Sequence, residues 1–349
     1  GAMMEIPAKN LLSVEKMERL PSAQMDAANI AHRDERPIAE PASLVKLPNP
    51  IRLKDQTPPE WIYFSRNGGT SIRTAIAAET FVKGQSGNLL FHQSAWWSWN
   101  EKVWEEKEEI AVKAAVRRLL TSHPLGKELT KTAVITDVTE QIRLLLVTDS
   151  SFPGFDADME KIVLQNGTLD LKGKPVFKNA HRRRDYRSIQ LGFNYDPQAR
   201  CPRFMKFLYE LELDRDTQCR LQEWAGYLII PTAKLQKSLL LIGEGANGKS
   251  MLLLTLQAML GKDNVSSLEM AELFDRFKVA MLRGKLANIA TDVETSQVMD
   301  ARFKKLVAGE PQVAEQKYRD PFEFTPFARL LFSANDFIPT KDRSLGFFR

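Results

Sequence analysis

The chain has 349 residues, enough for two domains or for one domain with a substantial extension. Its hydrophobic content of 43% and charged content of 27% are ordinary for a soluble globular protein, and no apolar stretch could span a membrane, so we expect no membrane partner. Lys and Arg total 49 against 44 Asp and Glu, and this net charge of +5 permits nucleic-acid binding without establishing it. The two cysteines, Cys201 and Cys219, exclude a disulfide framework and a zinc cluster, and indicate a reducing cytoplasm.

The first part of the chain has the composition of a linker. Residues 1–59 carry many prolines and mixed charges, and only residues 11–20 and 24–32 have helical spacing. Gly1, Ala2 and Met3 before Met4 are typical of the remnant of a cleaved tag. We therefore predict an arm over residues 1–59 that is partly disordered or helical.

Short strands and two helices are predicted next. Between residues 60 and 104 the apolar residues come in short runs broken by glycine, which predicts short strands or a hairpin. Residues 105–122 predict a helix because acids stand early and arginines late, and Pro124 and Gly126 follow its end. A second helix is predicted over residues 136–146.

The pattern changes after residue 160. Residues 162–171, with Asn166-Gly167 inside, predict two strands around a tight turn. Residues 202–213 and 216–229 predict helices. From residue 238 onward strands and helices alternate, which is typical of an α/β nucleotide-binding core.

The most informative motif is a complete G-x-x-x-x-G-K-[ST] phosphate-binding loop. Residues 239–242 before it predict a buried strand, and residues 251–260 after it predict an apolar helix, so backbone N–H groups and the helix dipole would surround a polyphosphate. Glycine lets the backbone wrap phosphates closely, Lys249 supplies a point charge, and the Ser250 hydroxyl would ligate Mg²⁺. The predicted nucleotide-binding residues are Gly243, Glu244, Gly245, Ala246, Asn247, Gly248, Lys249, Ser250 and Met251.

Two later apolar runs end on polar residues. Residues 285–291 lead into Asp292, which we predict to hold Mg²⁺ with Ser250, and Glu294 follows as a carboxylate that orients the attacking water. Residues 328–334 lead into Asn335, whose amide would contact a γ-phosphate or the water attacking it. Taken alone, each polar residue could simply suit a turn at a strand end. The phosphate loop upstream favours the catalytic interpretation.

Together these residues resemble the superfamily 3 helicase module of phage and plasmid primases. Upstream, residues 166–171 and 195–208 are similar to the domain that precedes this helicase in poxvirus and phage primase-helicases. The resemblance covers roughly residue 60 to the end of the chain. The strings that carry it in the helicase module are Gly243-x-Gly245-x-Asn247-Gly248-Lys249-Ser250, Ile289-Ala290-Thr291-Asp292, residues 303–311 and 317–326, and Phe332-Ser333-Ala334-Asn335.

The resemblance implies an α/β fold with an AAA+-like P-loop ATPase core over residues 233–349 and a mixed α/β N-terminal domain over residues 60–232. The core would be incomplete at its C-terminus, because the family's core continues past Arg349. The implied function is an ATP-dependent DNA helicase of a phage, plasmid or other mobile element, in which a homo-hexamer uses ATP and Mg²⁺ to translocate on single-stranded or forked DNA. A primase or polymerase on the same or another chain is an expected partner, in the cytoplasm of a bacterial or virus-infected cell.

The resemblance also implies roles for single residues. Lys249 would neutralise the β- and γ-phosphates, Ser250 and Asp292 would hold Mg²⁺, and Asn335 would sense the γ-phosphate. Glu294 has no fixed counterpart in the family. An arginine finger supplied to the neighbouring subunit is expected at Arg349, with Arg343 as the alternative, although either could be an ordinary surface arginine.

A hairpin that contacts DNA is expected between the strand ending at Asp292 and the strand ending at Asn335. Residues 312–320 occupy this interval, and Lys317 near its tip would contact phosphate without reading sequence. The alternative for Lys317 is a solvated loop lysine. Lys304 and Lys305, on a predicted helix just before, either contact DNA or face solvent or a neighbouring subunit.

Two upstream clusters and one alternative function stay open. The basic run at residues 181–187 could contact nucleic acid, although a solvated loop is favoured. Four tryptophans between residues 96 and 104 are assigned to packing. The alternative function is a non-catalytic DNA-binding or assembly module whose ATPase core acts only as a nucleotide-dependent oligomerisation platform.

Overall fold

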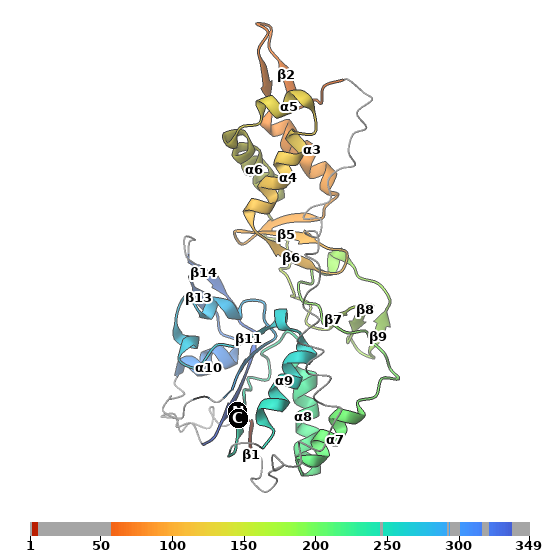
Figure 1. Cartoon of the computed structure of the whole chain (residues 1–349), viewed down its shortest axis with the longest axis vertical. Coiled ribbons are helices and arrows are strands. Elements are labelled where there is room, and N and C mark those ends of the chain that lie inside the picture. Colours follow the sequence, from red (N-terminus) through yellow and green to blue (C-terminus); the bar gives the residue numbers. More distant parts are fainter. Residues whose placement is uncertain are drawn as a thin grey trace, which may run out of the picture. The chain divides into compact units, whose positions relative to one another are not determined.

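The computed structural model describes residues 2–5, 57–244, 247–291, 293, 301–315 and 321–336 (Figure 1). The fold is mixed α/β with a parallel sheet. It divides into two compact units: unit 1 comprises residues 1–25, 158–181 and 189–349, and unit 2 comprises residues 26–157 and 182–188. This division differs from the expected boundary between residues 232 and 233, because residues 158–181 and 189–232 pack with the sheet that follows them.

Unit 1 is built on a five-stranded sheet in which every neighbouring pair is parallel. The strands lie in the order β1 (Ala2–Glu5), β10 (Leu239–Ile242), β15 (Arg329–Ala334), β12 (Ala287–Ala290) and β11 (Val265–Ser266). Strands β10, β12 and β15 are mostly apolar and almost entirely buried, as expected where both faces of a sheet are covered. The predicted strands at residues 239–242, 285–291 and 328–334 are therefore confirmed.

One strand was not predicted. Residues 1–59 were expected to be an arm, but Ala2–Glu5 pair with Leu239–Ile242 along the outer side of β10. Without this pairing, the backbone N–H and C=O groups of β10 would stand at an edge of the sheet. The two stretches of helical spacing at residues 11–20 and 24–32 lie outside the described residues.

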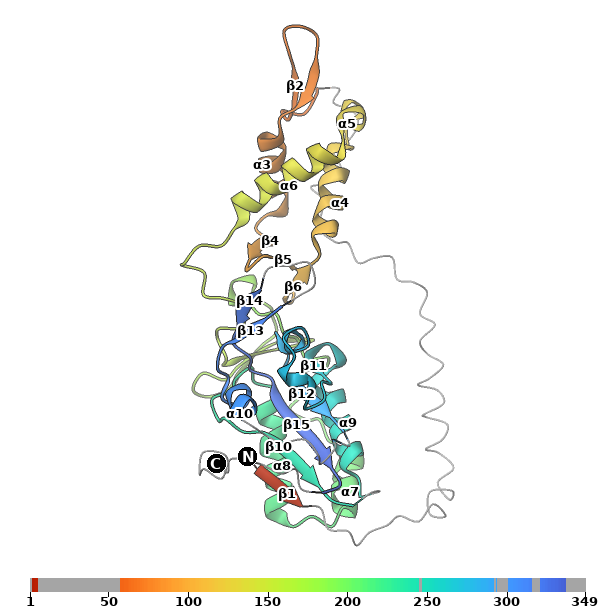
Figure 2. The ribbon, with the colours of Figure 1, turned by 90° about the vertical axis from the view of Figure 1, so that its left-hand side faces the viewer.

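Alternate residues of the strands enter two cores, one on each face of the sheet. Leu239, Leu241 and Ile289 pack with helices α8 (Arg215–Leu228) and α9 (Lys249–Leu260). Leu240 and Phe332 pack on the other face, with helix α10 (Ala301–Ala308) and the antiparallel hairpin of β13 (Gln312–Ala314) and β14 (Phe322–Phe324). The sheet of unit 1 thus lies between two layers (Figure 2).

A small antiparallel sheet precedes these helices in unit 1. Strands β7 (Lys161–Leu164), β8 (Gly167–Asp170) and β9 (Val176–Lys178) form a meander, which confirms the turn predicted at Asn166-Gly167. The Asn166 side chain donates to the Tyr195 carbonyl at 3.0 Å and accepts from the Tyr195 N–H at 2.8 Å. These bonds join residues 166–171 to residues 195–208, the two upstream segments on which the resemblance rests. Helix α7 (Pro202–Glu210) follows, as predicted.

The described residues of unit 2 form four α-helices and two antiparallel sheets. The helices are α3 (Thr74–Gln85), α4 (Glu109–Leu120), α5 (Pro124–Leu129) and α6 (Thr132–Leu146). A hairpin of β2 (Ile62–Phe64) and β3 (Thr70–Ile72) precedes them. The second sheet contains β4 (Leu89–His92), β5 (Ala95–Trp99) and β6 (Trp104–Lys107). Among the described residues of both units, no helix is both long and apolar enough to cross a bilayer.

Three expectations for unit 2 need correction. Residues 60–104 contain helix α3 as well as strands, because Ala77, Ala78 and Phe81 share one buried helical face. Helix α4 begins at Glu109 rather than at residue 105, because Trp104–Lys107 pair with β5. Pro124 does not only follow α4 but begins α5, where the missing N–H of proline costs nothing.

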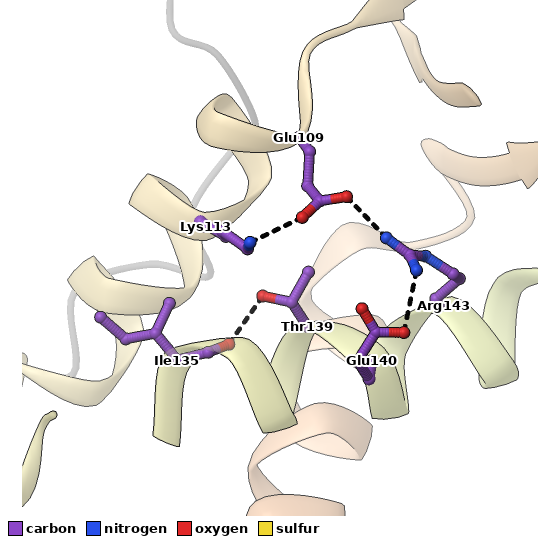
Figure 3. Close-up of polar contacts among 6 residues, drawn as sticks. All are labelled: Glu109, Lys113, Ile135, Thr139, Glu140 and Arg143. Carbon is purple, nitrogen blue, oxygen red and sulfur yellow. Dashed lines mark hydrogen bonds and ion pairs between the residues drawn. The ribbon is translucent and has the colours of Figure 1, made fainter. Parts of the chain in front are cut away.

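An ionic cluster joins α4 to α6 (Figure 3). Arg143 donates to Glu109 at 2.6 Å and to Glu140 at 2.9 Å, and Lys113 pairs with Glu109 at 2.6 Å. The hydrogen bond from Lys113 and the charge of Arg143 lower the pKa of Glu109, against the effect of partial burial. The guanidinium of Arg143 also lies 4.9 Å from the centre of the Phe91 ring, so the cluster is continuous with the core of unit 2.

Candidate phosphate-binding site

The candidate site is the turn between β10 and α9, at the carboxyl edge of the parallel sheet. Gly248 is the N-cap of α9 and has φ of 83°, in the left-handed region that favours glycine. A Cβ atom at this position would lie 2.6 Å from Cδ2 of Leu211 and 3.4 Å from Cε2 of Phe207. Glycine is therefore required here both by the backbone and by the side chains of Phe207 in α7 and of Leu211 at its end.

Lys249 is buried within the turn. Its ammonium donates to the carbonyl oxygen of Gly243 at 2.5 Å, to that of Glu244 at 2.9 Å and to Oδ1 of Asn247 at 2.9 Å. These oxygens satisfy the donors of a buried ammonium but carry no full negative charge. A buried cation held within the loop is what an anion site requires electrostatically.

The first turn of α9 adds further positive potential. The N-cap residue, Gly248, has no side chain that could accept from the amides at this helix end. The N–H groups there and the helix dipole favour an anion beside Lys249. Ser250 and Met251, in the same turn, are exposed, so a hydroxyl is accessible next to the buried ammonium.

The ends of β12 and β15 lie beside the start of this loop. Ile242 is in register with Ala334, and the Gly243 N–H donates to the Ala334 carbonyl at 3.3 Å. On the other side of β15, the Val293 N–H donates to the Ser333 carbonyl at 2.8 Å. Asn335 follows Ala334 directly and is exposed, so its amide lies at the edge where the loop begins. The structure thus brings Asn335 and the phosphate loop to one sheet edge.

Several predicted site residues lie outside the described residues, and their assignments stay predictions. Thr291 and Val293, on either side of Asp292, belong to the sheet edge just described. Within the described part of the chain, no group of three or more His, Cys, Asp or Glu side chains could hold a metal ion. The predicted residues outside this part are Gly245, Ala246, Asp292, Glu294, Lys317, Arg343 and Arg349.

The predicted DNA-contacting segment has the expected hairpin. Strands β13 and β14 pair from Gln312 with Phe324 to Ala314 with Phe322, while the tip at residues 316–320 is outside the described residues. An ion pair of 3.0 Å between Arg276 and Glu315 ties the hairpin to the segment between β11 and β12. Lys304 is half-buried and Lys305 is exposed on α10, whose Phe303 and Leu306 face the core.

Sequence reasoning missed the packing of α7 against the loop. Phe207 belongs to a segment chosen only for its resemblance, and Leu211 was not singled out at all. The signal was present in Phe204, Phe207, Leu208 and Leu211, which recur every three or four residues as on one face of a helix. Such a face predicts burial, but its partner comes from a distant part of the sequence.

Buried polar residues of the sheet were also missed. Arg329, 2% exposed, donates to the carbonyls of Phe327 at 2.8 Å, Thr232 at 3.3 Å and Leu228, the last residue of α8. Burial lowers the pKa of Arg329 to about 10, and its guanidinium lies 5.1 Å from the centre of the Tyr227 ring. Arg329 thus fixes the end of α8 to β15.

The upstream clusters are largely structural. Arg183 donates to the Ser86 carbonyl at 2.5 Å and to Asn88 at 2.8 Å, and the buried Arg187 pairs with Asp156 at 3.4 Å. Arg182 and Arg184 are exposed, as the predicted solvated loop requires. The assignment of the tryptophans to packing is confirmed for the two that are buried, Trp96 and Trp104. Trp97 stacks on Phe155 with ring centres 4.0 Å apart.

Comparison with solved structures found chains of similar arrangement. The A form apo structure of the NrS-1 C-terminal region matches 76% of this chain and 57% of that chain, with 14% identity and a TM-score of 0.46. Another A form apo structure of that region matches 78% of this chain and 59% of that chain, with 13% identity and a TM-score of 0.45. The chain therefore spans less than two thirds of the length of these solved chains. Among curated proteins, none matches this sequence.

Two family models match successive parts of the sequence. Residues 241–345, which include the phosphate loop and Asn335, match a family of unknown function (DUF5906). Residues 63–211 match the family described as D5 N terminal like. This second match supports a relationship to the phage primase-helicases and a role connected with replication.

Proposed function

We propose that the chain carries an ATP-dependent DNA helicase motor of superfamily 3, with an AAA+-like P-loop ATPase core over residues 233–349. One observation carries the proposal. Lys249 is buried in the turn between a parallel strand and an uncapped helix N-terminus, and Asn335 lies at the end of the neighbouring strand. This is the placement that phosphoryl transfer needs: a fixed cation for the phosphates and a polar side chain where the terminal phosphate would lie.

The loop would accept the phosphates of a nucleoside triphosphate. Phosphate oxygens would replace the loop oxygens as acceptors for the Lys249 ammonium and would accept from the amides that begin α9. The left-handed Gly248 gives the backbone close access to the phosphates. The other residues proposed to contact the nucleotide are Gly243, Glu244, Gly245, Ala246 and Asn247 of the loop and Met251 in the first turn of α9.

Hydrolysis would draw on residues at both edges of the site. Ser250 and Asp292 would hold Mg²⁺, which when bound neutralises charge on the β- and γ-phosphates. Glu294 would orient the attacking water and Asn335 would contact the γ-phosphate. Arg349, or alternatively Arg343, would reach the site of the next subunit in a homo-hexamer and stabilise charge that develops during phosphoryl transfer.

The DNA-contacting part of the motor would be the hairpin of β13 and β14. Lys317 would contact phosphates from its tip, with Lys304 and Lys305 of α10 nearby in sequence. Single-stranded or forked DNA is the proposed substrate, in the replication of a phage, plasmid or other mobile element. A primase or polymerase on this or another chain is the proposed partner, in the cytoplasm. The match to the D5 N terminal like family supports the proposed role in replication.

The test is ATP hydrolysis with and without single-stranded DNA, for the parent chain and four variants. We expect stimulation by DNA in the parent and no turnover in Lys249→Ala, while Lys262→Ala, which changes an exposed lysine beyond α9, turns over like the parent. Asn335→Ala should bind nucleotide normally but hydrolyse it about 100-fold more slowly, as expected for loss of one group that acts on developing charge. Asn179→Ala is its matched control, because Asn179 is an exposed asparagine of the same unit.

Two outcomes would redirect the proposal. Equal turnover by the parent and Lys249→Ala would remove the ATPase assignment. ATP binding that drives association in light scattering, without turnover in any condition, would favour the non-catalytic assembly platform instead.

A further inference from the structure

A basic hollow of about 610 Å³ lies at one end of unit 2. It is lined by α4 and α5, and none of the described residues that line it is acidic. Three of its lining residues are exposed cations, and within the described residues none of them pairs with an acid. The lining residues are Ala114, Arg117, Arg118, Thr121 and Lys127.

The end of α4 does not need these cations as caps. Cations in a last helical turn interact favourably with the helix dipole, and that is the ordinary role of such residues. Here, however, the Thr121 hydroxyl donates to the Arg117 carbonyl at 2.9 Å and the Ser122 hydroxyl donates to the Leu119 carbonyl at 2.7 Å. These two carbonyls at the helix end thus accept from neutral hydroxyl groups. The guanidinium groups of Arg117 and Arg118 remain available for an anion.

Helix α5 joins this hollow to the hairpin of β2 and β3. Gly126 of α5 packs so closely that a Cβ atom there would lie 1.9 Å from the Leu120 carbonyl oxygen and 3.0 Å from Cη2 of Trp61. Leu120 is the last residue of α4, and Trp61 directly precedes β2. Helix α5 and the hairpin accordingly lie at the same end of the unit in both views (Figure 1, Figure 2).

The hairpin exposes aromatic rings and further cations. Tyr63 is 39% exposed and Phe64 is 51% exposed, and the Arg73 guanidinium lies 4.4 Å from the centre of the Tyr63 ring. Arg66 is exposed in the turn. The turn itself is closed by hydrogen bonds from the Ser65 N–H to the Gly69 carbonyl at 2.8 Å and from the Gly69 N–H to the Ser65 hydroxyl at 2.9 Å. The rings are thus presented on an ordered support.

Charge is segregated along α4. The helix begins at Glu109, which forms ion pairs with Lys113 and Arg143. Three further glutamates lie just before it, at positions 105, 106 and 108. The opposite end carries the three exposed cations of the hollow. A polyanion would therefore be attracted to the hollow and repelled from the other end of the helix.

We propose that the hollow and the hairpin of unit 2 together bind single-stranded DNA, with backbone phosphates on Arg117, Arg118 and Lys127 and an unpaired base on the exposed ring of Phe64. Exposed aromatic rings beside cations are how proteins bind single strands without reading sequence. Stacking on the ring requires a base that is not already paired, which favours a single strand over a duplex. The inference rests on the proposed function, because it gives the motor a second contact with its strand outside the ATPase core.

The test is the binding of a labelled oligothymidine to the full chain without nucleotide, followed by fluorescence anisotropy over a range of salt. In the triple variant Arg117→Gln/Arg118→Gln/Lys127→Gln we expect weaker binding and a slope of log K against log [salt] that is shallower by about 2, since each phosphate on a single strand contributes roughly 0.7. Phe64→Ala should weaken binding roughly tenfold through lost stacking, with little change in that slope. Arg117→Lys/Arg118→Lys keeps the charge and should keep most of the affinity.

The matched control removes equal charge elsewhere on the same unit. Lys83, Arg182 and Arg184 are exposed, so Lys83→Gln/Arg182→Gln/Arg184→Gln should bind like the parent. An equal loss in both triple variants, or none in either, would overturn the proposal. Equal loss of binding to a blunt duplex would overturn the assignment to single strands. Lys249→Ala should bind the oligothymidine like the parent, so that loss of hydrolysis and loss of this contact are separate results.

Discussion

Gly243 donates its backbone N–H to the carbonyl of Ala334 at 3.3 Å, and this bond joins the first residue of the phosphate loop to the last residue of β15. Strands β10 and β15 are far apart in the sequence, yet they pair so that Ile242 lies opposite Ala334. This pairing brings Asn335 to the start of the loop. Phosphate contact and phosphate sensing would thus be set by one pair of parallel strands. For substitutions at this edge of the sheet, the effect on the stability of unit 1 and the effect on nucleotide binding should therefore be measured separately.

We predict that Gly248→Ala destabilises unit 1 and weakens nucleotide binding. The left-handed φ of 83° should cost about 1–2 kcal/mol for alanine, and the close approach of Leu211 adds a packing cost. Gly173→Ala is the control, because Gly173 also has positive φ, of 71°, but no atom within 4 Å of the added Cβ. Urea unfolding should show a larger loss for Gly248→Ala, which Leu211→Ala partly relieves. Equal losses at both glycines would contradict the packing argument.

A buried amide fixes the short edge strand of the sheet. Asn288 of β12 accepts from the Leu268 N–H at 2.8 Å and from the Ser266 hydroxyl at 2.9 Å, and it donates to the Leu268 carbonyl at 2.9 Å. We predict that Asn288→Ala lowers the free energy of unfolding by about 2–4 kcal/mol, because it leaves buried backbone groups without partners and opens a small cavity. Chemical unfolding of this variant beside the exposed Asn179→Ala tests it. A loss below that of Asn179→Ala would show that β11 does not depend on this side chain.

The sequence was sufficient where structure is decided locally. The turn from β10 to α9 follows from an apolar run, a glycine-rich motif and a second apolar run that are contiguous in the chain. Asn166-Gly167 likewise specifies its own turn. The ends of β12 and β15 were predicted, but their position beside the loop depends on β15 lying between β10 and β12, a strand order that local patterns do not encode.

Tertiary partners explain what the sequence did not reveal. Strand β1 exists through its pairing with β10, and nothing in residues 2–5 alone distinguishes it from the arm that was predicted. Helix α3 was hidden by the glycine-broken runs around it, although Ala77, Ala78 and Phe81 already have helical spacing. Arg183 belongs to a basic run whose composition suggested that it binds a polyanion. Its guanidinium instead donates to Ser86 and Asn88, which are about 95 residues earlier in the chain. Composition cannot separate such a residue from Arg117, whose guanidinium lines an open hollow.

The ionic cluster between α4 and α6 should make unit 2 less stable in acid. The pKa of Glu109 is lowered from 4.5 in the folded chain, chiefly by Lys113, so its ionised form stabilises the fold above pH 4.5, and this contribution is lost as the pH falls through the folded pKa. Because the Glu109 side chain is 41% exposed, we expect an effect below about 1 kcal/mol. Melting temperatures of the parent and Glu109→Gln should differ slightly at neutral pH, with the parent higher, and should converge in acid. Glu79→Gln, at an exposed glutamate of α3, should follow the parent throughout. If the gap between parent and Glu109→Gln instead widened as the pH fell, the ion pairs of Glu109 would not be what stabilises this helix contact.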